Sequence, residues 1–100
     1  MSLGPMICEE VAADDHAVDA FAMSMKAKMA AGRAKGRGGW RDPARCSIAS
    51  LEAMFCDHLG KTNPGNYVDL AIIAMMIHLR QQWGGVAPAA PSASGNTDEG

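Results

Sequence analysis

The sequence predicts an all-α fold, a three-helix domain followed by a disordered C-terminal tail. Apolar residues recur at three- and four-residue spacing in three segments, which is the helical period. Apolar and polar residues nowhere alternate over a run long enough for a strand. Eight methionines, many alanines and few aromatic residues also favour helices.

One hundred residues allow one small domain. We expect residues 1–13 to form an N-terminal leader that begins with cloning residues, and residues 14–83 to form the helical domain. Residues 84–100 are mostly Gly, Pro, Ala and Ser, which bury too little surface to offset the entropy of ordering. They are predicted to be a disordered tail.

The first predicted helix starts at Asp14 or Asp15, because either carboxylate would cap it and suit its N-terminal dipole. Gly32 is expected to end or weaken it. Its apolar stripe is Val18, Phe21, Ala22, Met25 and Met29.

The second helix is predicted to follow Ser47, a favourable N-cap, and to run to Leu59. Gly60 stands where a left-handed residue commonly ends a helix. The apolar face is Ile48, Leu51, Phe55 and Leu59.

The third helix is predicted to start at Asn63, as the cap, with Pro64 in the first helical position, and to end near Trp83. It is apolar almost all round, so it must be covered on every side. Two short amphipathic helices cannot do that within one small chain. We therefore expect a homodimer in which the second and third helices of two copies form a four-helix bundle.

Other features exclude several classes of protein. Cys8, Cys46 and Cys56 are an odd number without CxxC spacing, which predicts free thiols in a reducing cytoplasm rather than a disulfide framework or zinc site. The N-terminus lacks a secretory pattern. The apolar run from Leu70 to Ile77 is far shorter than the ~20 residues that span a bilayer, so no membrane partner is expected.

Asp69 is a carboxylate inside the most apolar helix, and it needs a partner because an isolated buried charge is very costly. Arg80 lies three turns away on the same helix, too far to neutralise it. One alternative is that Asp69 converges with Glu52 and Asn66 on Mg²⁺ or Mn²⁺, which prefer hard oxygen ligands. The other is an ion pair with a basic side chain of residues 35–45.

A glycine-rich basic segment, "GRAKGRGGWRDPARC", precedes the second helix. Glycine lets a backbone approach phosphate, and Lys and Arg neutralise it. The segment therefore favours a nucleotide-phosphate clamp, in which Trp40 stacks on a base. The clamp residues would be Lys35, Arg37, Trp40 and Arg41. A nucleic-acid contact, or a solvated loop with Trp40 as a plug on the bundle end, remain alternatives.

A resemblance adds to these patterns. The stretch "GNYVDLAIIAMMIH", with the preceding "FCDHLGKTNP" and "AKGRGGW", resembles small phage and prophage proteins related to the MazG-like nucleotide pyrophosphohydrolases. The resemblance covers about Phe21 to Trp83. It implies an all-α dimer or tetramer that hydrolyses nucleoside triphosphates to monophosphate and pyrophosphate, with magnesium held by helix carboxylates in EExxE and ExxD motifs.

On this resemblance Asp69 matches the aspartate of ExxD, Asn66 replaces its glutamate, and Glu52 stands in for EExxE. The set carries fewer carboxylates than the family uses, and no catalytic residue is assigned. The implied function is that of a nucleotide-binding, magnesium-dependent hydrolase in the cytoplasm of a bacterial host. The alternative is a non-enzymatic phage accessory protein whose basic loop binds nucleic acid or a host protein.

Overall fold

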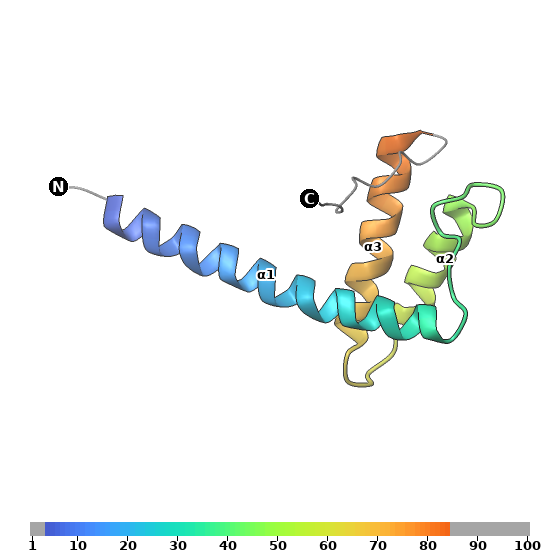
Figure 1. Ribbon diagram of the computed structural model, residues 1–100, viewed down its shortest axis with the longest axis horizontal. Coiled ribbons are helices and arrows are strands. Elements are labelled where there is room, and N and C mark those ends of the chain that lie inside the picture. Colours follow the sequence, from blue (N-terminus) through green and yellow to red (C-terminus); the bar gives the residue numbers. More distant parts are fainter. Residues whose placement is uncertain (1–3, 85–100) are drawn as a thin grey trace, which may run out of the picture.

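The computed structural model describes residues 4–84, which form three helices, α1 (Gly4–Ala34), α2 (Ile48–Leu59) and α3 (Asn66–Trp83). No strand occurs in this part of the chain. The predicted all-α, three-helix fold is therefore confirmed. α2 and α3 lie side by side as an antiparallel pair, and α1 packs against α3 (Figure 1). Apart from Gly84, the predicted tail lies outside the described residues.

α1 is much longer than the sequence predicted. It begins at Gly4 and not at Asp14, and it passes through Gly32 to Ala34. The predicted start was wrong because the preceding "MICEEVAA" consists mostly of good helix formers, so the helix needs no cap at residue 14. The chain leaves the helix at Gly36, whose φ of 86° is readily adopted by glycine.

The ends of α2 follow the prediction in part. The Ser47 side chain caps the helix and accepts a hydrogen bond of 3.0 Å from the backbone N–H of Ser50, as predicted. Gly60 does follow the last helical residue, but its φ of −88° is right-handed and not left-handed. The Gly60 N–H donates to the His58 carbonyl, so the helix ends without needing a positive φ.

α3 begins at Asn66, and the predicted start at Asn63 and Pro64 was wrong. The chain first makes a turn in which the Asn66 N–H donates to the Asn63 carbonyl at 3.2 Å. Gly65 then occupies the N-cap position with a φ of 82°, which cannot belong to a right-handed helix. The predicted end at Trp83 is confirmed, and Gly84 closes the helix by donating to the Arg80 carbonyl.

The hydrophobic core lies between α2 and α3, where Leu51, Ile72 and Ile73 are buried. The remaining apolar faces are less covered than predicted. Leu59, Val18 and Phe21 are 58%, 67% and 41% exposed. For Val18 and Phe21 the reason is geometric, because the N-terminal half of α1 extends beyond the α2–α3 pair (Figure 1). One copy of the chain therefore leaves apolar helix surface in contact with water.

No helix within residues 4–84 combines the length and the hydropathy that crossing a bilayer requires.

Candidate phosphate-binding groove

An open groove of about 840 Å³ lies between the end of α1, the loop that follows it, and the α2–α3 pair. Its floor is apolar and includes Leu51, Ile73 and Met76. Its rim is cationic. The cationic side chains are Lys28, Arg33, Lys35, Arg37 and Arg41. Asp69 is the one carboxylate among the lining residues that the structure describes.

The predicted phosphate-binding residues all line this groove. Lys35, Arg37, Trp40 and Arg41 come from the glycine-rich loop, and the structure brings them together with Lys28 and Arg33 of α1. The sequence analysis assigned neither Lys28 nor Arg33 to the clamp. Both lie on the last turns of a helix that leads directly into the loop, and this position could have indicated that they line the same groove.

The loop is folded tightly onto the end of α1. The backbone N–H groups of Lys35 and Arg37 both donate to the Gly32 carbonyl at 3.0 Å. Gly39 has a φ of 84°, and a Cβ there would lie 2.9 Å from Cζ of Arg45. A side chain at residue 39 would therefore be strained and would displace the Arg45 guanidinium.

Arg80 fastens this loop to α3. The side chain is only 5% exposed. Its Nη1 donates to the carbonyl of Trp40 at 2.8 Å and to the carbonyl of Cys46. The sequence analysis considered Arg80 only as a distant partner of Asp69 and missed this role. The available signal was an arginine on an apolar helix without an acid within one turn.

Trp40 stacks on Trp83, with ring centroids 5.6 Å apart and planes inclined by 26°. The stack joins the loop to the C-terminal end of α3, as expected if Trp40 plugs the end of the helix pair. One face of the Trp40 ring is therefore already covered. Trp40 also lines the groove. Its packing on the end of the helix pair is therefore compatible with a role in the phosphate clamp.

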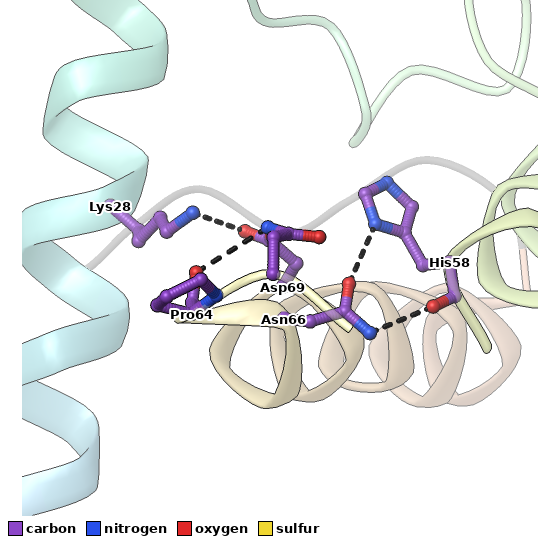
Figure 2. A network of polar contacts seen from close by, with 6 residues as sticks. Lys28, His58, Pro64, Asn66 and Asp69 are labelled. Atoms are coloured by element: carbon purple, nitrogen blue, oxygen red, sulfur yellow. Dashed lines mark hydrogen bonds and ion pairs between the residues drawn. The ribbon is translucent and has the colours of Figure 1, made fainter. Parts of the chain in front are cut away.

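Asp69 pairs with Lys28, whose Nζ lies 2.9 Å from the Asp69 Oδ1 (Figure 2). Asp69 therefore has an ion-pair partner, but the prediction that it would come from residues 35–45 was wrong. α1 packs against α3 and brings its own lysine to the carboxylate. Lys28 passes over Gly65, where an added Cβ would lie 3.4 Å from Cε of Lys28.

Asn66 is buried, with 5% exposure, and its side-chain amide is fully used. Nδ2 donates to the carbonyls of His58 at 2.8 Å and Lys61 at 3.0 Å. Oδ1 accepts from Nδ1 of His58 at 3.3 Å, which places the imidazole proton on Nδ1, because an amide oxygen can only accept. Asn66 thus locks the turn between α2 and α3.

The three predicted metal ligands are not brought together as a set. Asn66 points toward His58, whereas Asp69 points toward Lys28 (Figure 2). Glu52 is exposed on α2 and does not line the groove. Within residues 4–84, no three His, Cys, Asp or Glu side chains form a group that could hold a metal ion. In this arrangement the donors do not fit Mg²⁺, and the magnesium site stays a prediction.

Comparison with protein-family models, curated proteins and solved structures finds no match for this chain. The resemblance to MazG-like proteins therefore stays an expectation from the sequence. The fold and the groove define the class, an all-α domain with a cation-lined groove over an apolar floor.

Proposed function

We propose that this chain is a nucleotide-binding protein and that the groove holds the nucleotide phosphates. The observation that carries the proposal is the charge of the lining, which has five cationic side chains and one carboxylate among the described residues. That carboxylate is already paired with Lys28. Guanidinium and ammonium groups form strong, charge-assisted hydrogen bonds with phosphate oxygens.

The rest of the groove suits the other parts of a nucleotide. Glycines 36, 38 and 39 line it, and backbone without side chains can approach a phosphate closely. Met29 and Met76, which are half-buried, offer apolar surface for a base. Sites for small ligands commonly combine such an apolar surface with a few converging polar groups.

Hydrolysis of nucleoside triphosphates to monophosphate and pyrophosphate is the activity that the resemblance implies, and we retain it as part of the proposal. If Mg²⁺ or Mn²⁺ participates, it would neutralise phosphate charge and orient a water. The residues of this chain supply the phosphate contacts through Lys35, Arg37 and Arg41. We derive no step through Asp69 and Asn66, because Lys28 and His58 engage them.

A second copy of the chain belongs to the proposal, because Met54, Leu59 and Tyr67 are 45%, 58% and 81% exposed on α2 and α3. A four-helix bundle of α2 and α3 from two copies would cover such faces. We also propose that the protein acts in the cytoplasm of a bacterial host. The three cysteines, Cys8, Cys46 and Cys56, are free, as is usual in a reducing compartment.

Thermal unfolding with a panel of dNTPs and NTPs, with and without Mg²⁺ or Mn²⁺, tests the binding. A ligand that binds only the folded chain raises the melting temperature in proportion to the logarithm of its concentration over Kd. We expect the rise to disappear in the double variant Lys35→Gln with Arg37→Gln. It should persist in Lys26→Gln, which removes an exposed cation that does not line the groove.

Absence of any shift at millimolar nucleotide would refute the proposal, as would an equal shift in the double variant. Pyrophosphate release measured on the same samples tests the hydrolysis separately. Stabilisation by oligonucleotide alone, with a steep dependence on salt, would instead support the non-enzymatic accessory protein that binds nucleic acid.

A further inference from the structure

The first half of α1, residues 7–21, is an arm with an apolar stripe that no other part of residues 4–84 covers. At 100° per residue the stripe residues fall within roughly 80° of one helix face. They are Ile7, Val11, Val18 and Phe21, with exposures of 57%, 52%, 67% and 41%, and Asp14 lies on the same face between Val11 and Val18. The same face continues to Met25 and Met29, which are half-buried where α1 meets the rest of the molecule. The stripe therefore has a packing partner only in its second half.

The arm cannot turn back onto its own α2–α3 pair. α1 is one continuous helix, and its first half points away from the other two helices (Figure 1). Residues 7 to 21 span about 21 Å of helix. A lone helix of this length is marginal in water and gains most of its stability from packing. A partner that covered the stripe would therefore stabilise the arm.

The charges of the arm and of the groove are opposite. The arm carries five acids and not one Lys or Arg, and the acids are Glu9, Glu10, Asp14, Asp15 and Asp19. The groove presents five cations and an apolar floor. The same chain therefore contains an exposed helix that is acidic and apolar, and a groove that is basic and apolar.

We propose that the arm of one copy docks against the groove of a second copy, and that the second copy returns the contact with its own arm. The arm occupies the first half of α1 and the groove adjoins the last turns of the same helix. Two copies satisfy both contacts at once when their α1 helices run antiparallel about a two-fold axis. The acidic half of each α1 then lies along the basic half of the other.

A second copy is the occupant that the charges favour. Nucleic acid would be repelled by the arm, since its phosphates and the arm are both anionic. An unrelated protein would have to reproduce a pattern that this chain already contains. The partner's carboxylates approach the same cations as the phosphates in the proposed function, so a docked arm and a nucleotide compete for the groove. Association itself requires no nucleotide.

Sedimentation equilibrium tests the apolar contact. We expect wild-type protein at low ionic strength to show twice the mass of the 10.5 kDa chain. The double variant Val11→Glu with Val18→Glu should weaken association at least 100-fold. The control, Ala13→Glu with Ala20→Glu, adds the same charge on the far side of the arm and should change it less than threefold. Circular dichroism verifies that each variant remains helical.

Reversing charges on the arm of one chain and on the groove of another tests whether these two surfaces contact each other. One chain carries Asp14→Lys with Asp15→Lys, and another carries Arg33→Glu with Arg37→Glu. Each alone should associate much more weakly than wild-type protein, because the first pair of changes lowers the net charge of the arm from −5 to −1 and the second lowers that of the groove lining from +4 to 0. Their equimolar mixture should form a one-to-one dimer, since the unaltered arm meets the unaltered groove and the introduced lysines meet the introduced glutamates. The variant Glu9→Lys, on the far side of the arm, should associate like wild-type protein.

A monomeric wild-type protein at high micromolar concentration overturns the inference, as does a mixture that stays monomeric. The arm contact is an alternative to the α2–α3 bundle as the dimer interface. A dimer that tolerates Val11→Glu with Val18→Glu, and each of the charge-changing pairs, supports that bundle and overturns the inference. If the protein is a monomer whose groove binds oligonucleotide, nucleic acid is the occupant of the groove. If deletion of residues 85–100 makes the groove available to ligand, that segment is the occupant. Nucleotide stabilisation is measured separately on the Val11→Glu with Val18→Glu variant, whose arm should not dock, so its absence there refutes only the proposed function.

Discussion

The ammonium of Lys28 on α1 lies 2.9 Å from the carboxylate of Asp69 on α3. These side chains are 43% and 22% exposed, so the pair lies between a surface salt bridge and a buried one. The contact explains how an acid is tolerated in the most apolar helix of the chain. It also joins the end of the long helix to the beginning of the last one.

Replacing Asp69 with Asn should lower the free energy of unfolding by about 1 kcal/mol. The change removes a partly exposed ion pair and a negative charge near the N-terminus of α3, and each effect is worth at most about 1 kcal/mol after solvent screening. Urea unfolding measures the difference, which should shrink at high salt.

The control for Asp69 is Asp57→Asn, which removes an exposed carboxylate of α2 and should have no measurable effect. A double-mutant cycle with Lys28→Met isolates the coupling between the two side chains. An Asp69→Asn variant that is as stable as wild-type protein or more so would contradict the ion pair. It would restore the interpretation of Asp69 as a carboxylate held for a metal.

Replacing Asn66 with Asp should destabilise the protein by roughly 2–3 kcal/mol. The new carboxylate loses two donated hydrogen bonds and faces the carbonyls of His58 and Lys61, in a position where the wild-type side chain is 5% exposed. Thermal unfolding measures the loss, with the exposed Asn63→Asp as the matched control. Tighter binding of Mg²⁺ at nearly unchanged stability would instead identify residue 66 as a metal ligand.

Replacing Arg80 with Met should cost about 2–3 kcal/mol and free the basic loop from α3. The guanidinium donates to the carbonyls of Trp40 and Cys46, and hydrogen bonds to charged groups are worth about 1.5–3 kcal/mol. Because Trp40 stacks on Trp83, tryptophan fluorescence and near-ultraviolet circular dichroism report the release.

The variant Gln81→Met, at an exposed neighbouring position, should leave both the stability and the tryptophan signal unchanged. If Arg80→Met preserved the signal of the stacked rings, the hydrogen bonds to the loop would not be what holds the two tryptophans together.

Two glycine substitutions should differ in sign. Gly65→Ala should destabilise by about 1–2 kcal/mol, because its φ of 82° strains any side chain and Lys28 lies over the position. Gly60→Ala should be neutral or stabilising by up to about 1 kcal/mol, since its φ is −88° and nothing lies within 4 Å of an added Cβ. Calorimetry measures the melting temperatures of the two variants. Equal changes would contradict the left-handed φ of Gly65 and the right-handed φ of Gly60.

The sequence by itself determined the three helices, the cap at Ser47 and the end at Trp83, because period and capping are local properties of neighbouring residues. It also indicated the basic loop residues that line the groove, since Lys35, Arg37, Trp40 and Arg41 are close in the chain as well as in space.

Only the tertiary structure decided which partner each buried polar group takes. Asp69 meets Lys28 because α1 packs against α3, and Asn66 faces His58 because the chain reverses at Gly65. Arg80 reaches the loop because Trp40 lies at the far end of α3. A helical period gives the face on which a side chain lies but not the element that packs on that face, since packing depends on contacts between residues far apart in sequence.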